Sequence, residues 1–175
     1  AVVVEGLEAG GHIGQQTTMS LVPQIVDQLT IPVIAAGGIG DGRGYAAACM
    51  LGAEGVQIGT RFLVAKEAIV HQNYKKKILD AKDSDTIVTG QRSGHPIRSI
   101  KNNMTREYLK KEENGVSSEE LECLAAGSLK RAVQDGDIIN GTIMAGQIAG
   151  MIKKEQSCSQ IISEIMTEAK ILLKV

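Results

Sequence analysis

The segment Pro32-Val33-Ile34-Ala35-Ala36-Gly37-Gly38-Ile39 decides the fold of this chain. Its apolar run, Val33 to Ala36, shows no polar alternation, which is typical of a strand buried on both faces of a parallel sheet. Gly37 and Gly38 follow, and the absence of a Cβ lets their backbone approach a ligand closely. Residues 42–51 then predict a helix. Backbone N–H groups at such a turn favour an anion, most often a phosphate. A plain tight turn is the alternative interpretation.

The segment Gly55-Val56-Gln57-Ile58-Gly59-Thr60-Arg61-Phe62 repeats this pattern. A short apolar strand ends at Gly59 and Thr60, and a helix is expected to follow. Two successive strand–glycine–helix units are typical of adjacent parallel strands. In (β/α)8 barrels, the loops after the last two strands commonly share one phosphate. The pair therefore favours a phosphate site over two plain turns.

The composition excludes several classes of function. The 175 residues carry a net charge of −1, which gives no reason to expect a nucleic acid or an anionic membrane as partner. Aromatic residues make up 2%, so little surface is available for stacking on bases. No apolar run is long enough to span a bilayer. Three isolated cysteines, Cys49, Cys123 and Cys158, lack metal-ligand spacing, so we expect free thiols, no metal site and a cytoplasmic protein.

The chain opens on an apolar strand, residues 1–4, without a methionine, and we expect it to be the later part of a longer protein. A glycine-rich loop, residues 5–14, follows at the end of the strand that carries ligands in α/β folds. His12 lies in this loop, exposed and able to titrate near neutrality. An isolated surface histidine usually has no function, but the neighbouring phosphate site favours a catalytic one. For Glu5 and Glu8 we expect a structural role.

The rest of the chain predicts further elements. Ser20 is a good N-cap for a helix over 21–29, with Pro23 in its first turn. The lysines at 75, 76 and 77 indicate a solvated helix face, and an acidic partner is the weaker alternative. His95, followed by Pro96, is a less favoured functional histidine than His12. The other expected elements are helices over 65–70, 73–81, 104–113, 118–134 with a break at Gly127, and 157–173, and extended segments over 86–89 and 97–101.

Residues 141–150 are rich in small side chains. They predict a helix packed closely on a flat surface. Met144 and Gln147, one turn apart, would then face a ligand. Contact between two helices is the alternative interpretation.

An ordered set of motifs resembles the flavin-dependent enoyl-(acyl-carrier-protein) reductase II family, which is related to the nitronate monooxygenases, formerly 2-nitropropane dioxygenases. The Gly-Gly-His-Ile-Gly loop, the Thr-Thr-Met that follows and the late Met-Ala-Gly-Gln are the more specific motifs. Monooxygenase relatives tend to have arginine where Ile13 stands, which favours the reductase. The motifs are Glu8–Gly14, Thr17–Met19, Ile31–Ile39, Gly55–Phe62 and Met144–Gly150.

The resemblance implies a (β/α)8 TIM barrel that binds FMN, with a smaller inserted α/β domain. Residues 1–70 would form the last three β/α units of the barrel, residues 71–140 the smaller substrate-side domain, and residues 141–175 helices that return to the barrel. A complete barrel needs about 250 residues. This chain alone is therefore expected to be inactive without the N-terminal part of the same protein.

The resemblance also implies roles for individual residues. His12 would face the flavin and the substrate as the catalytic residue. The expected cofactor-binding residues are Gly11, Gly37, Gly38, Gly59, Thr60, Met144 and Gln147, with the FMN phosphate on the backbone of Gly37, Gly38, Gly59 and Thr60. NAD(P)H would be the co-substrate and an enoyl-acyl carrier protein the substrate, with a homo-oligomer and a monovalent cation also expected.

Three other functions stay open at this point. In a nitronate monooxygenase, His12 would instead act as the base that takes a proton from a nitroalkane, with FMN and O2. A dehydrogenase acting on a nucleotide monophosphate, as in the IMP dehydrogenase family, also has a Gly-Gly-Ile loop. That family usually has an acid where Ala36 stands, and the first loop here has no cysteine. A non-catalytic phosphate-binding fragment is the remaining alternative.

Overall fold

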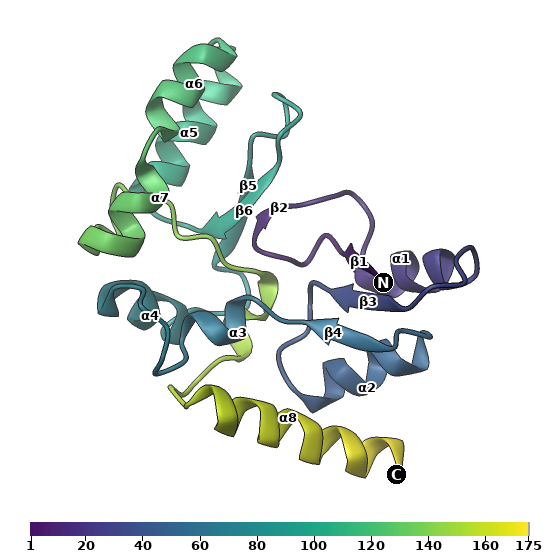
Figure 1. Ribbon diagram of the computed structural model, residues 1–175. Helices are drawn as coiled ribbons and strands as arrows, with labels where there is room; N and C mark the ends of the chain where they lie inside the picture. The colour runs from purple at the N-terminus through teal and green to yellow at the C-terminus, as the bar shows by residue number, and fades with distance from the viewer. Residues whose placement is uncertain (175) are drawn as a thin grey trace.

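The computed structural model describes residues 1–174. Three parallel strands form the first sheet, in the order β1 (Val2–Glu5), β3 (Val33–Ala36) and β4 (Gly55–Gln57). Helices α1 (Thr18–Val26) and α2 (Gly42–Met50) connect them. The predicted parallel β/α units and the α/β class are confirmed. Strands β1 and β4 are the two edges of this sheet (Figure 1).

The C-terminal helix α8 (Cys158–Leu173) covers α2, and the two run side by side in Figure 1. A Cβ added at Gly42 would lie 2.5 Å from the Cβ of Glu168, so glycine permits this close approach. Apolar residues of the parallel sheet and its helices form one buried cluster, made of Val4, Val22, Val33, Ala35, Ile39, Ala48 and Ala53.

The second sheet is antiparallel and has the order β2 (Gly11–His12), β6 (Ile97–Ile100), β5 (Thr86–Thr89). Helices α5 (Asn103–Glu113) and α6 (Ser118–Ala125) pack beside it (Figure 1). The expected strands and helices of this region are confirmed. His12 is exposed as predicted, but its backbone is paired with β6 and is not a free loop.

The remaining elements are short. After Gly127, whose φ of 68° marks the predicted break, come α7 (Ser128–Lys130) and the π-helix η1 (Arg131–Asp135). The remaining three elements are α3 (Thr60–Leu63), α4 (Gln72–Leu79) and the 3-10 helix η2 (Gln147–Met151), and η2 contacts both of these helices. Among residues 1–174, no helix combines the length and the apolar character needed to cross a membrane.

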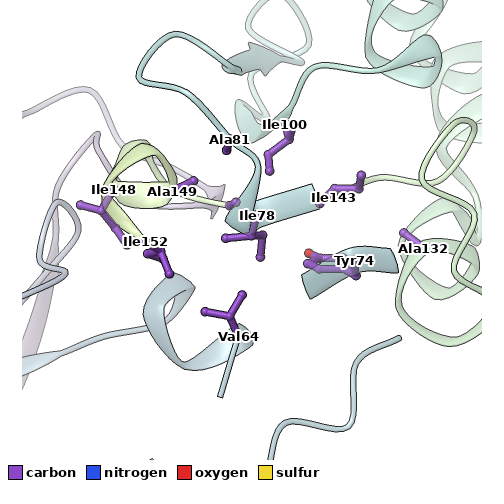
Figure 2. Close-up of a cluster of buried hydrophobic side chains, with 11 residues drawn as sticks. Val64, Tyr74, Ile78, Ala81, Ile100, Ala132, Ile143, Ile148, Ala149 and Ile152 are labelled. Atoms are coloured by element: carbon purple, nitrogen blue, oxygen red, sulfur yellow. The ribbon is translucent and has the colours of Figure 1, made fainter. Parts of the chain in front are cut away.

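A second core lies where α4, β6 and the segment 143–152 meet (Figure 2). Tyr74 and Ile78 of α4 are 1% and 0% exposed. Figure 2 shows their side chains between those of Val64, Ile100 and Ile143. This core joins α4 and the segment 143–152 to strand β6 of the antiparallel sheet. Its members are Val64, Tyr74, Ile78, Ala81, Ile100, Ala132, Ile143, Ala145, Ile148, Ala149 and Ile152.

The prediction of a helix over 141–150 is wrong. The chain is extended up to Gly146, and only η2 is helical. Met144 forms a β-bridge with Ser99, and the carbonyl of Ile143 accepts a 2.8 Å hydrogen bond from the N–H of Ile100. The small residues permit a crossing of two main chains, because a Cβ at Gly146 would lie 2.7 Å from the carbonyl oxygen of Glu8.

The first predicted helix is also placed wrongly, because it begins at Thr18 and ends at Val26, so Pro23 is in its interior. The carboxylate of Glu8 accepts hydrogen bonds from the N–H and hydroxyl of Thr18, at 3.0 to 3.1 Å, and so fixes the start from a distant loop. This confirms the structural role of Glu8. Pro23 has no N–H, so it cannot donate the usual helical hydrogen bond to the carbonyl of Met19. Met19 is 66% exposed.

Residues 65–70 are not helical, so the predicted helix there is wrong: α3 ends at Leu63, and Ala65 forms a parallel bridge with Gln156 before a turn and irregular chain. Lys75 does not lie on a solvated face, because it is 2% exposed. Its Nζ donates to the carbonyl of Ala65 at 2.6 Å and contacts the carboxylate of Glu155 at 3.1 Å. The lysine thus holds the turn segment against the C-terminal part of the chain.

Candidate functional site

A cavity of about 340 Å3 lies at the carboxyl ends of β3 and β4, and we call it the glycine cavity. Gly38 reaches it from the corner after β3, and Gly59 and Thr60 reach it from the corner after β4. Met144 lines it from the extended segment that precedes η2. The two glycine corners therefore meet at one cavity, as the repeated sequence pattern predicts.

The backbone N–H groups of Gly38, Gly59 and Thr60 donate no hydrogen bond to any of residues 1–174. A Cβ at Gly59 would meet nothing within 4 Å, so its backbone borders open space. Free N–H groups around a cavity are suited to an anion such as a phosphate. The glycine cavity thus contains the donors that a mononucleotide phosphate needs.

The sequence predicted free N–H groups at the start of α2, but these groups already donate hydrogen bonds within the protein. Asp41 accepts from the N–H groups of Arg43 and Gly44 at 3.0 and 3.1 Å. The N–H of Gly42 donates to Glu168 at 2.8 Å. Protein carboxylates thus already satisfy the start of this helix, and the free donors lie in the preceding corner.

Gly37 adopts a φ of +85°, and a Cβ there would lie 2.8 Å from the carbonyl oxygen of Gly6. Gly37 does not line the glycine cavity. A glycine is needed at this position because the sharp corner requires a positive φ. Gly11 also has a positive φ, of +83°, and the sulfur of Met144 would be 3.5 Å from its added Cβ. Both glycines therefore shape the backbone around the cavity.

A larger cavity of about 480 Å3 lies between the antiparallel sheet and helices α5, α6 and α7, and we call it the histidine cavity. His12 of β2 and Ile97 of β6 are directly paired, so their side chains project from the same face of the sheet. Met104, Leu129 and other side chains of the helices form the opposite wall. The cavity combines apolar surface with hydroxyl groups and two histidines, His12 and His95.

Met144 lines both cavities and thus lies at their boundary. Its carbonyl accepts a 2.8 Å hydrogen bond from the hydroxyl of Tyr74. Burial raises the pKa of Tyr74 well above its usual value, although the bond to Met144 opposes this shift, so the hydroxyl stays protonated as a donor. Tyr74 was missed by sequence reasoning, because its helical spacing to Ile78 indicates only a core position.

Of the residues expected from the sequence, Gly38, Gly59, Thr60 and Met144 come together at the glycine cavity, and His12 lies across Met144 in the neighbouring one. Gln147 lines neither cavity and is exposed. Its N–H donates to the carbonyl of Glu8 at 2.9 Å. The change from the expected helix to an extended segment explains this, because Met144 and Gln147 no longer share a helix face.

A protein-family model described as nitronate monooxygenase matches residues 1–168. The chain belongs to the nitronate monooxygenase family. A probable nitronate monooxygenase of Staphylococcus haemolyticus is 36% identical over 185 residues, which cover 99% of this chain and 52% of that relative. The chain thus spans about half the length of this curated member of the family.

Two solved structures match the chain over nearly its whole length. FabK from Thermotoga maritima is 46% identical with a TM-score of 0.93, over 99% of this chain and 55% of that one. A nitroalkane oxidase from Streptomyces ansochromogenes is 27% identical with a TM-score of 0.81, over 99% of this chain and 52% of that one. Proteins with differently named activities therefore share this fold.

Proposed function

We propose that the full-length protein that contains this chain is an FMN- and NAD(P)H-dependent reductase of trans-2-enoyl thioesters, with an enoyl-acyl carrier protein as the natural substrate. The likeness to FabK, an enoyl-(acyl-carrier-protein) reductase II, over 99% of the chain carries this proposal. The other half of the protein would supply the earlier strands of a (β/α)8 barrel. Those strands would pair with the free edges of β1 and β4.

The glycine cavity fits an FMN phosphate, since its three free N–H groups point to no protein acceptor. In the proposal, Gly38, Gly59 and Thr60 bind this phosphate. Gly11, Gly37 and Gln147 support the surrounding backbone, and Met144 lies beside the ring system. When bound, FMN supplies the hydride chemistry between NAD(P)H and the substrate.

His12 acts on the substrate in the histidine cavity. As the β-carbon of an enoyl thioester gains a hydride, negative charge develops on the thioester oxygen and the α-carbon. A protonated imidazole can donate a proton to the α-carbon as a general acid. Pairing with β6 holds His12 in place for this step.

The dimensions of the histidine cavity also support the reductase. A small nitroalkane would fill only a fraction of about 480 Å3, whereas an acyl thioester needs such a volume. Apolar side chains such as Ile97 and Met104 suit the acyl chain.

Nitronate monooxygenase is the second candidate, because the curated relatives carry this name. His12 would then take a proton from the nitroalkane.

The deciding experiment uses the full-length protein, purified with its yellow cofactor. We expect NAD(P)H oxidation that depends on a crotonyl thioester. Oxygen uptake with a nitronate, without need of NAD(P)H, would select the monooxygenase instead. The variant His12→Ala should retain bound flavin but lose most enoyl reduction. Full activity in that variant would remove His12 from the mechanism.

A further inference from the structure

Ser99 carries a buried polar atom without a partner. Its side chain is 1% exposed, and within residues 1–174 its Oγ is the single buried side-chain oxygen or nitrogen found without a hydrogen bond. A buried hydroxyl that makes no hydrogen bond destabilises the folded state, because it has lost its bonds to water without replacement. Such an atom in a cavity wall indicates that something outside the chain completes its bonding.

The position of Ser99 on β6 directs its hydroxyl into the histidine cavity. Successive residues of a strand alternate between the two faces of the sheet. Arg98 faces the other side, where its guanidinium donates to the carbonyl of Leu7. Ile97 and Ser99 share the face that lines the cavity, and His12 is paired with Ile97. His12 and Ser99 are thus diagonal neighbours, about 7 to 8 Å apart in such a ladder.

Ser99 also lies next to the boundary between the two cavities. Ser99 forms an antiparallel bridge with Met144, which lines both of them. A ligand group held by Ser99 would therefore be close both to His12 and to the glycine cavity. This is where the reacting part of a substrate must lie if a cofactor occupies the glycine cavity.

Other hydroxyl groups in the same wall are already engaged within the protein. Ser128 and Thr142 share a hydrogen bond of 2.7 Å. The hydroxyls of Ser93 and Thr105 donate to backbone carbonyls at 3.1 and 3.0 Å. Each of these four hydroxyls makes a hydrogen bond within the protein, so Ser99 is the one of the five whose hydroxyl has no partner among residues 1–174.

We infer that Ser99 is a substrate-binding residue that donates a hydrogen bond to the carbonyl oxygen of an enoyl thioester. This inference rests on the proposed function. A carbonyl oxygen is an acceptor without a proton, so it matches a hydroxyl that needs an acceptor. The same bond would strengthen as negative charge develops on that oxygen, while His12 serves the α-carbon. Ser99 thereby fixes which end of the acyl thioester faces the boundary at Met144.

The test compares two ligands on two variants of the full-length, flavin-loaded protein. Crotonyl-CoA has the carbonyl, and the matching but-2-enyl thioether of CoA lacks it. Calorimetric titration without NAD(P)H gives the Kd of each. Ser99→Ala should weaken crotonyl-CoA binding about tenfold and leave thioether binding unchanged. Ser99→Cys, which keeps a weak donor, should fall between wild type and Ser99→Ala.

Ser128→Ala is the matched control, because it removes a hydroxyl of the same cavity that is bonded to Thr142. It should lower thermal stability and change the Kd of both ligands by the same factor. Ser99→Ala should not lower thermal stability, since the hydroxyl that it removes has no partner in the free protein.

The outcomes separate the inference from the proposed function. An equal effect of Ser99→Ala on both ligands, in a protein that reduces crotonyl-CoA, would overturn the role of Ser99 and leave the reductase in place. A wild-type protein that neither binds nor reduces crotonyl-CoA would overturn both. A tenfold loss confined to the thioester supports the inference.

Discussion

The hydroxyl of Tyr74 donates a 2.8 Å hydrogen bond to the main-chain carbonyl of Met144. Tyr74 belongs to α4 and is 1% exposed, whereas Met144 belongs to the extended segment between the two cavities. The bond joins elements that are 70 residues apart in the chain. It thus fixes the boundary of the site from within the core shown in Figure 2.

Replacing Tyr74 by phenylalanine removes this donor and keeps the ring. We expect the free energy of unfolding to fall by about 1 kcal/mol, the usual value of a buried hydrogen bond. The full-length variant should also show a raised KM for the enoyl thioester, because the main chain at Met144 is less well held. Urea denaturation and steady-state kinetics measure the two effects. An unchanged KM and stability would show that the bond has no role.

Comparison of the wild type with Tyr74→Phe also gives a prediction for alkaline pH. Burial raises the pKa of Tyr74 in the folded chain, whereas in the unfolded chain it stays near 10. Above pH 10, the unfolded state therefore loses a proton that the folded state keeps. Linkage then makes the wild type lose stability relative to Tyr74→Phe as the pH rises further. Denaturation curves at pH 8 and 10.5 test this.

A substitution at Gly59 tests the assignment of the glycine cavity. Gly59 has a negative φ of −96°, and a Cβ there meets nothing within 4 Å. Gly59→Ala should therefore leave the stability of the flavin-free protein nearly unchanged. Its methyl group would enter the space proposed for the phosphate, so flavin binding should weaken at least tenfold. Flavin titration followed by fluorescence measures the Kd.

Gly14→Ala is the control for this experiment. A Cβ at Gly14 also meets nothing within 4 Å, but Gly14 does not line the glycine cavity. We expect the same stability and an unchanged flavin Kd. Equal Kd values in the two variants would argue against a phosphate at the corner after β4.

The parallel part of the fold could be predicted because its signals are local. The apolar runs before Gly37 and Gly59 and the helix that follows at 42–51 are each contained in a few consecutive residues. The meeting of both corners at one cavity then follows from the geometry of adjacent parallel strands. His12 in a glycine-rich loop was also recognisable as a candidate, although its pairing with β6, residues 97–100, was not.

The errors concern residues whose partners are far away in the sequence. Lys75 lies in a run of three lysines, but its buried position depends on Ala65 and Glu155. The segment 141–150 has small residues that suit either a helix or two crossing main chains, and its contact with Glu8 decides between them. Ser99 gives no signal in the sequence, because only the complete hydrogen-bond pattern shows that its hydroxyl lacks a partner.

Asp41 provides the last prediction, because it occupies the N–H groups that the sequence suggested for a phosphate. Its carboxylate accepts from the N–H groups of Arg43 and Gly44 and from the Arg43 side chain. Asp41→Ala should lower the free energy of unfolding by about 1 kcal/mol, as the loss of an N-cap usually does. Asp41→Asn should cost less, since its amide oxygen still accepts. Flavin binding should not change, because α2 does not hold the phosphate in our proposal.

The pH dependence of the same variants separates the cap from the ion pair. Partial burial would raise the pKa of Asp41, but hydrogen bonds from Arg43 and Gly44 outweigh it and leave the pKa below its usual value. The charged carboxylate therefore stabilises the folded state above pH 4, and this stabilisation is lost as the pH falls through the lowered pKa. The difference in unfolding free energy between wild type and Asp41→Asn should shrink between pH 7 and pH 3. A difference that stays constant would show that the oxygen atoms of Asp41, and not its charge, hold the start of α2.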